Sequence, residues 1–289
     1  MADDINQTIA SFRENLVYKA ADQDLIVAIN KAIFESQELK EKIDRAGAEN
    51  KLLWGKGTLE DMARWHPKRA RIISNRIFTD VESSVPILTS ENPDPAILGE
   101  LDNNAKERMR KAMQIAYEVK YDMQSKIQRM VRHWFLFRVG VLKYRWVEGK
   151  GYSTENVIPR KIGMDKTATS LQDCEYIWEE LSDTLENLQK KFPKKKTELE
   201  QFASGKNIKT KIRYLEFWGG GGEWVVWKIR DVILDKIKNP NFDYENKENN
   251  IFEQPKFPYL FLNVFNIGDQ NGLYDDISIV EEASSLQAD

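Results

Sequence analysis

Two adjacent carboxylates, Asp275 and Asp276, are the most suggestive residues for chemistry in this sequence. A carboxylate pair can bind a divalent metal ion, and metal-bound water can then cleave a phosphodiester bond of nucleic acid. The pair also stands where an apolar helical pattern begins, and a helix N-terminus favours acidic side chains because of the helix dipole. The further carboxylates of a clustered acidic site do not accompany it. We therefore expect Asp275 and Asp276 to cap a helix, and keep a metal-dependent nucleic-acid-processing enzyme as the alternative.

The two histidines and the single cysteine do not form a second candidate catalytic or metal site. Neither His66 nor His133 stands beside another imidazole or a cysteine at metal-ligand spacing. His133 follows Arg132 within a long helical pattern, so we interpret it as a packed or hydrogen-bonded residue. Cys174 excludes an internal disulfide, and within an apolar strand pattern it is expected to be a small core residue rather than a nucleophile. The sequence thus predicts no catalytic residue, no metal ligand and no cofactor, and the protein is not expected to be an enzyme.

Four consecutive glycines, residues 219–222, raise the question of a phosphate-binding loop. Such a loop needs a Lys-Ser or Lys-Thr pair followed by a helix, whereas Glu223 and Trp224 open a strand pattern. The glycines are better suited to the turn of a hairpin between residues 212–218 and 223–229, because glycine permits positive φ values. Both strand patterns are largely apolar, which predicts a hairpin covered on both faces.

Composition limits the class of partner. The chain has 289 residues, and 41% hydrophobic with 31% charged residues is typical of a soluble globular protein. The net charge is −3, from 43 basic and 46 acidic residues, so any contact with DNA is expected to be local or transient. No window has the roughly 18–20 apolar residues of a membrane span, and the acidic start resembles no signal peptide. These features predict a cytosolic protein without a membrane partner.

The element that organises the chain is a long helical pattern from Asp102 that ends in a strand. Asp102 or Asn103 can cap a helix of about 35 residues, and Gly140 is the expected stop. Alternation over residues 141–146 then predicts a half-buried strand. The opposite face of the helix is basic, but interleaved acidic residues favour a solvated surface. The apolar stripe, expected to be core, consists of Met109, Met113, Ala116, Val119, Met123, Ile127, Met130, Trp134 and Phe137.

The flanking segments complete an α+β fold, with long helices packed on a mostly antiparallel sheet. Residues 1–57 predict a helical N-terminal arm, apolar over 25–33 and so polar afterwards that it should be exposed or packed on a neighbouring subunit. Residues 58–275 predict the α+β domain, and residues 276–289 the start of a helix without a stop signal. We therefore expect the chain to be the first part of a longer polypeptide.

Several shorter elements are predicted inside the α+β domain. A helix over 68–82 should present Ile72, Ile73, Ile77 and Val81, with Val85 after it, as its inner face. The further predictions are a returning strand over 156–162 that contains Pro159, a strand over 174–179, a helix capped at Asp183 or Thr184 and ended by Pro193, a polar loop over 239–255 and a strand over 257–265.

Read in order, several of these segments resemble the portal proteins, or head–tail connectors, of tailed bacteriophages. The resemblance covers roughly residues 58–289, and one motif departs from it, because Lys166 stands where the family usually has proline. The segments that carry it are 68–77; 85–88 with the Asn92-Pro93-Asp94-Pro95 turn; the helix-to-strand element at 137–146; 163–169, 173–179 and 185–193; the tryptophan-bearing hairpin at 216–218 and 224–234 with Asn239-Pro240; and 271–287.

The resemblance implies the wing domain of a portal, without its stem, clip and crown. It implies a ring of twelve subunits at one capsid vertex, through which double-stranded DNA passes during genome packaging and ejection. The implied partners are the terminase motor, tail adaptor proteins, and the major capsid or scaffolding protein. The implied location is the virion, with assembly in the host cytoplasm. The resemblance assigns no active site and no DNA-facing or interface residues. Another structural protein of a phage head or adaptor stays open as an alternative.

Overall fold

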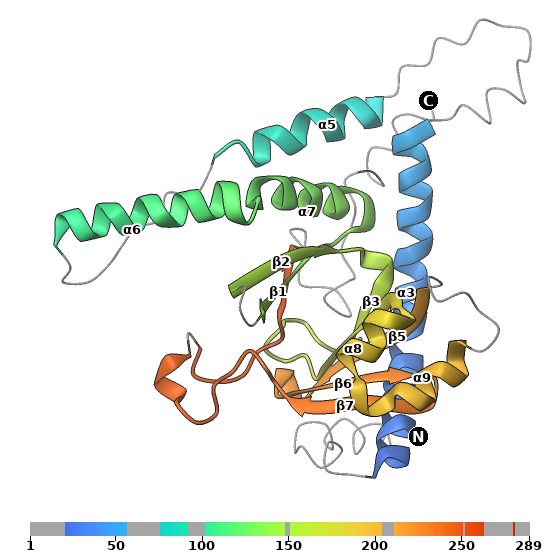
Figure 1. Cartoon of the computed structure of the whole chain (residues 1–289). Helices are drawn as coiled ribbons and strands as arrows, with labels where there is room; N and C mark the ends of the chain where they lie inside the picture. The colour runs from blue at the N-terminus through green and yellow to red at the C-terminus, as the bar shows by residue number, and fades with distance from the viewer. Residues whose placement is uncertain are drawn as a thin grey trace, which may run out of the picture. The chain divides into compact units, whose positions relative to one another are not determined.

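The computed structural model describes residues 21–56, 76–91, 102–147, 151–203, 211–250, 252–262 and 280 (Figure 1). These residues belong to two compact units. The described part of the first unit lies within residues 1–41 and 160–258, and that of the second within 42–159, 259–267 and 274–289. Each unit combines helices with one antiparallel sheet, so the predicted α+β class is confirmed. The predicted domain limits at residues 57 and 275 lie outside the described residues.

The first unit is built on a five-stranded antiparallel sheet. Its strands are β3 (Ile162–Met164), β4 (Tyr176–Thr184), β5 (Lys211–Gly219), β6 (Trp224–Ile229) and β7 (Val232–Lys238), in that spatial order. The predicted hairpin is confirmed as β5–β6, in which Gly219 faces Trp224. Gly220, Gly221 and Gly222 all have positive φ, as the turn requires. β7 extends the sheet beyond that hairpin.

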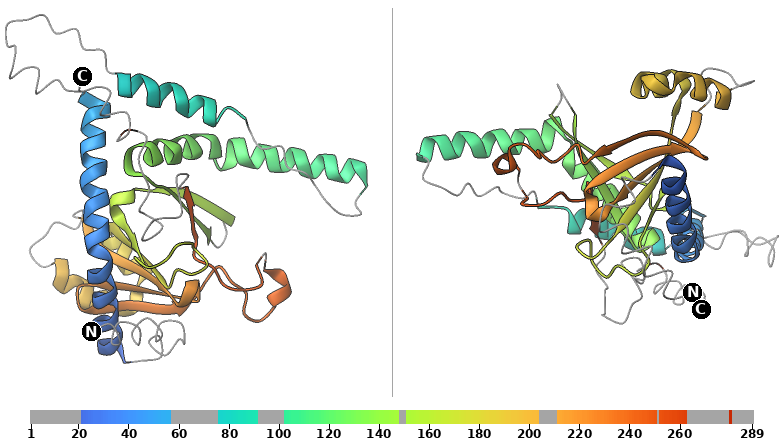
Figure 2. Two further views of the ribbon diagram at one scale, coloured as in Figure 1. Left: turned by 180° about the vertical axis from the view of Figure 1, so that it is seen from behind. Right: turned by 90° about the horizontal axis from the view of Figure 1, so that it is seen from below.

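The five-stranded sheet is covered on both faces, as predicted for its central hairpin. In the right-hand view of Figure 2, the blue helix α3 (Asp22–Lys56) lies on one side and the gold helices α8 (Leu185–Lys191) and α9 (Lys196–Ala203) lie on the other. Every residue of β6 is buried. Thr184 caps α8 by accepting a hydrogen bond from the Asn187 amide, and Pro193 begins a 3-10 turn just after α8 ends.

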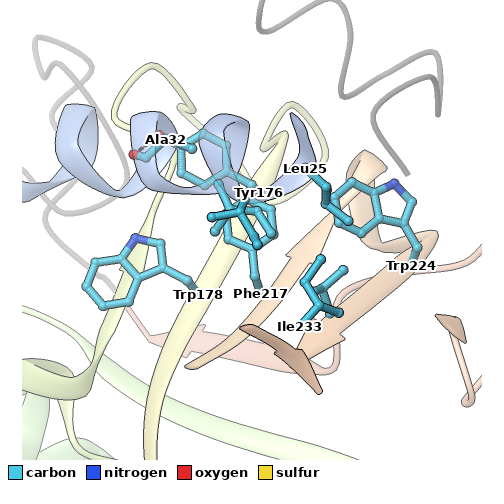
Figure 3. Close-up of a cluster of buried hydrophobic side chains, with 10 residues drawn as sticks. Leu25, Ala32, Tyr176, Trp178, Phe217, Trp224 and Ile233 are labelled. Carbon is cyan, nitrogen blue, oxygen red and sulfur yellow. Dashed lines mark hydrogen bonds between the residues drawn. The ribbon is translucent and has the colours of Figure 1, made fainter. Parts of the chain in front are cut away.

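The first part of α3 contributes to the core of this unit. Leu25, Ile26, Ile29 and Ala32 are buried against a sheet surface of Tyr176, Trp178, Phe217, Trp224 and Ile233 (Figure 3). The Tyr176 hydroxyl donates to the Ala32 carbonyl at 3.0 Å, and the Trp178 indole donates to the Ser36 hydroxyl at 2.9 Å. The expectation of a helical arm that buries little of itself within its own subunit is therefore wrong for this segment. Polar Ser36 can be buried because an indole N–H satisfies it.

The second unit has a three-stranded antiparallel sheet in the order β2–β1–β8. The strands are β1 (Gly140–Val147), β2 (Gly151–Val157) and β8 (Tyr259–Leu262). β1 was expected to be half-buried, but three consecutive residues, 141–143, are buried, so both of its faces are covered at this point. α7 (Met123–Phe137) packs against β1. Pro159 lies in a 3-10 turn after β2, rather than within a strand as predicted.

The helices of this unit share an apolar core with α7. In α5 (Arg76–Leu88), Ile77, Val81 and Val85 are buried together with Trp134 and Phe137 of α7, so this part of the predicted inner face is confirmed. Ile72 and Ile73 lie outside the described residues. The helix continues past the expected end at residue 82 and contains Pro86 in its last turn. Arg132 of α7 forms a two-point ion pair with Glu82 of α5, with both N–O distances at 2.8 Å.

The long helix predicted from Asp102 is interrupted in the structure. It consists of α6 (Asn103–Ile115), a π-helical turn η1 (Ala116–Lys120) and α7. Asp122 precedes α7 in a left-handed conformation with φ 45°. Neither α6 nor η1 has a buried residue, so the expectation that Met109, Met113 and Val119 are core is wrong. α7 covers the sheet, whereas α6 extends past it (Figures 1 and 2).

The ends of this helical segment also differ from the prediction. Asp102 occupies the N-cap position but makes no side-chain capping bond. The helix stops at Phe137, and the left-handed residue after it is Arg138 rather than glycine. Gly140 begins β1, where a Cβ atom would overlap the Met130 carbonyl. This glycine therefore serves the close approach of helix and strand, not the end of the helix.

Candidate functional site

The candidate residues from the sequence are not brought together by the structure. Asp275, Asp276 and His66 lie outside the described residues, so the capping and nuclease interpretations stay predictions. Among the residues that the structure does describe, no group of three or more histidine, cysteine, aspartate or glutamate side chains could hold a metal ion. No helix in the described ranges is long and apolar enough to cross a membrane.

Cys174 is a core residue, as its sequence context indicated. It is buried, and its thiol donates a hydrogen bond to the Tyr176 carbonyl at 3.2 Å. Burial raises the pKa of the thiol far above its usual value, and the nearby Asp165 carboxylate raises it further. Because the thiolate is the reactive form of cysteine, this side chain is unsuited to nucleophilic catalysis.

His133 lies on α7 and is held neutral by its surroundings. Burial of the ring, followed by the positive charge of Arg129, lowers its pKa to about 4. The ring meets Phe137 edge-on at 6.1 Å between centroids and hydrogen-bonds the Val157 backbone. Its Nδ1 atom is shielded from solvent and has no hydrogen-bond partner. A neutral ring accommodates this, since an unprotonated Nδ1 carries no charge.

A cavity of about 560 Å³ opens beside the glycine turn of the first unit. Gly220, Gly221 and Trp224 form one side, and the loop after β7 contributes Phe242 and Tyr244. Its volume lies in the range of small-molecule sites. The cavity is therefore the main candidate binding site among the described residues.

The loop that closes this cavity is fixed by Asn239. The Asn239 side chain donates to the carbonyls of Gly222 at 2.7 Å and Lys256 at 2.9 Å, and accepts from the Asn241 amide at 2.8 Å. The Tyr244 hydroxyl donates to the Glu223 carbonyl at 2.9 Å. Both ends of the loop are thus tied to the hairpin. The sequence predicted only a polar loop for this segment. These hydrogen bonds join residues that are distant in the chain, so no local pattern predicts them.

The cavity lining is mixed in charge. Lys238 lies over the Tyr244 ring at 4.9 Å, and the lining contains a second basic residue, Lys247, and two acidic residues, Glu223 and Glu253. Among the described residues that line it there is no histidine, cysteine, serine or threonine. Such a lining suits binding of a ligand through aromatic and charged contacts.

A buried carboxylate on the other face of the sheet was missed by sequence reasoning. Glu216 accepts a hydrogen bond from the Trp218 indole at 2.7 Å and another from the Trp227 indole at 2.9 Å. Nearby, Lys191 lies over the rings of Phe192, Tyr214 and Trp227 at 5.0–5.2 Å. In the sequence, only the two-residue spacing of Glu216 and Trp218 on one strand indicates that their side chains lie on the same face. Because the partners are all within the fold, we interpret this cluster as structural.

The other candidate is a surface of α6 and η1. Four large apolar side chains are exposed on these eighteen residues, and five basic side chains accompany them. An exposed apolar strip with charged edges is typical of a protein–protein interface. No protein-family model matches the sequence, and no curated protein is similar enough to it to count as a match.

Proposed function

We propose that this chain is a subunit of the portal of a tailed bacteriophage, which forms a ring at one capsid vertex and passes DNA during packaging and ejection. The observation that carries the proposal is the order of portal-like segments along residues 58–289. Each segment is short and has little weight alone. The order of helix, strand, tryptophan-bearing hairpin and loop along the chain is what resembles the portal family.

The described elements agree with this proposal in three of those segments. In residues 137–146, α7 passes into β1 within three residues. In residues 173–193, β4 is followed by α8 and then by Pro193. The tryptophan-bearing segment forms the β5–β6 hairpin. These are the local structures that the resemblance implies for each segment.

A portal subunit must bind copies of itself and needs no active site. The exposed apolar surface of α6 and η1 supports self-association, because burying such a surface against a second copy removes apolar area from water. The near balance of 43 basic and 46 acidic residues suits a channel along which DNA slides, since strong phosphate binding would hold it. The proposed partners are DNA in transit, the terminase motor, tail adaptors, and the capsid or scaffolding protein.

Electron microscopy of the full-length protein tests the proposal. Negatively stained particles should include closed rings with a central channel, and class averages give the number of subunits, for which we expect twelve. If only monomers or closed dimers form at every salt and protein concentration tried, the portal proposal is wrong.

Another structural protein of the phage head or adaptor is the second candidate, because the same exposed surface would serve it. Immunogold labelling of intact virions separates the two. Label at a single vertex is expected for a portal or its adaptor, and binding of terminase to the purified ring then selects the portal. Label spread over the capsid would favour a head protein.

A further inference from the structure

α6 and η1 present one apolar strip to solvent, called here the α6 face. Met109 and Met113 are each 48% exposed, Ile115 is 61% exposed and Val119 is 76% exposed. Met109 and Met113 are four residues apart, as are Ile115 and Val119, so each pair forms a ridge along the helix. At 100° per residue Ile115 lies about 120° around the axis from Met109, and the exposed side chains of Ala105 and Ala112 lie between the two ridges, so the apolar face is broad. A strip of this size on one helix needs a partner that covers it.

The α6 face is bordered by positive charge. Residues 103–120 contain five basic and two acidic residues. One acidic residue, Glu107, is already paired with Arg110 at 3.0 Å and Lys111 at 3.6 Å. With 100° between successive residues, Lys106 and Arg108 flank Met109 on its two sides. A partner that suits this face has an apolar strip with acidic edges.

The outer side of α3 has that composition and is called here the α3 face. Val27 is 59% exposed and Phe34 is 77% exposed. They are seven residues apart, which places them on the same side of the helix. Residues 22–41 contain five acidic and two basic residues, the reverse of residues 103–120. One of the two basic residues, Lys31, lies on the same side as Val27 and Phe34, and one of the acidic residues, Asp22, is paired with Lys236 at 3.0 Å. Asp24 and Glu41 are exposed near the two ends of the strip.

We propose that the α6 face of one copy binds the α3 face of a second copy. The two segments have 18 and 20 residues, or about 27 and 30 Å of helix, so their lengths match. Because the faces differ, each bound copy leaves one free face of each kind, and repeated binding gives a ring or an open filament. This pairing rests on the proposed function only for the closure of the ring; it adds which surfaces meet.

Disulfide trapping between two different variants tests the pairing. The natural Cys174 is buried, so Phe34→Cys and Met113→Cys each add one exposed thiol. One variant carries an affinity tag, the two are mixed and oxidised, and the products are separated without reductant. We expect mixed dimers to exceed both like-with-like dimers. A disulfide within one chain cannot form, because each chain has a single exposed cysteine.

The control replaces Met113→Cys with Thr197→Cys, an exposed position on α9 outside both faces. If mixed dimers of Phe34→Cys and Met113→Cys form no faster than with this control, the pairing is wrong. A predominance of like-with-like dimers would also overturn it, because the contact would then join identical faces.

Charge reversal tests the complementarity independently. The pair Lys106→Glu and Arg108→Glu, or the pair Asp24→Lys and Glu41→Lys, should each weaken self-association about tenfold by sedimentation. A chain with all four changes should recover most of that loss. Failure to recover, with circular dichroism showing folded variants, would contradict the proposal.

The two proposals can fail separately. Trapped mixed dimers from a protein that forms only open filaments would leave the pairing standing and contradict the portal ring. Closed rings in which Phe34→Cys and Met113→Cys do not cross-link would support the portal and exclude this pair of faces.

Discussion

Gly47 on α3 lies directly against the ring of Phe137 at the end of α7, and a Cβ atom at residue 47 would overlap that ring. Both residues are buried. The Asn50 side chain, one turn further along α3, donates to the Leu136 carbonyl at 2.9 Å. A small residue followed by a hydrogen-bonding one thus lets this otherwise polar half of α3 pack closely on the end of α7.

We expect Gly47→Ala to destabilise the protein, although alanine is normally the better helix former. The added methyl group must displace the Phe137 ring, and such overpacking typically lowers the free energy of unfolding by about 1–3 kcal/mol. Denaturant unfolding measures the loss. Combining Gly47→Ala with Phe137→Leu should lower stability by less than the sum of the two single changes. An additive result would show that the ring does not restrict residue 47.

Two neighbouring glycines of the β5–β6 turn should respond differently to alanine. Gly221 has φ 65° and open space around its Cβ position, so Gly221→Ala should lower stability by only about 1 kcal/mol, the strain of a left-handed backbone. Gly222 has φ 97°, and its Cβ would lie 2.5 Å from the backbone of Lys256 and Phe257. Gly222→Ala should therefore lower stability by clearly more. Equal losses in urea unfolding would argue against the close approach of the Asn239 loop.

Glu216→Gln should weaken the core of the first unit. The carboxylate accepts from two indoles, and an amide can accept from one while its NH₂ group opposes the other. Leaving a buried donor unsatisfied lowers stability by about 1–3 kcal/mol. NMR should show a shifted indole N–H signal for Trp218 or Trp227. Glu180→Gln, at an exposed position on β4, is the matched control and should be nearly neutral.

His133 should make stability depend on pH between 7 and 4. Its pKa is lowered to about 4 in the folded protein, from 6.5 when unfolded, so the unfolded chain binds the extra proton. The stabilisation is fully present above pH 6.5 and is lost as the pH falls. We expect about 1–2 kcal/mol less stability at pH 5 than at pH 7 from this residue. In denaturant unfolding, His133→Phe should reduce the difference in stability between pH 7 and pH 5 by this amount. If protonation of carboxylates causes the whole difference, the substitution would leave it unchanged.

Local patterns predicted the elements whose determinants lie close together in the chain. Consecutive glycines between two apolar runs were sufficient for the β5–β6 hairpin, and a 3.6-residue period was sufficient for the inner face of α5. The break at Asp122 was missed because the apolar spacing continues across it and aspartate tolerates a left-handed backbone. The same spacing could not reveal that α6 is exposed, since a strip that covers a core and a strip that binds a partner look alike.

The candidate site was less predictable than the fold. The cavity beside Gly220 depends on hydrogen bonds from Asn239 to residues 17 positions away on either side, which no local pattern encodes. The burial of Cys174 and His133 could be inferred from the apolar residues around them in the sequence, and burial is the largest cause of the pKa shift of each.

The π-helical turn η1 also sets the angular phase between two helices. A π turn holds one residue more than an α turn, so the apolar strip of α6 is rotated relative to that of α7. Deleting one residue within Ala116–Lys120 would turn α6 by about 100° about its axis and leave α7 on its sheet. The direction in which Met109 and Met113 point is thus controlled by the length of a five-residue segment, independently of the side chains that form the strip.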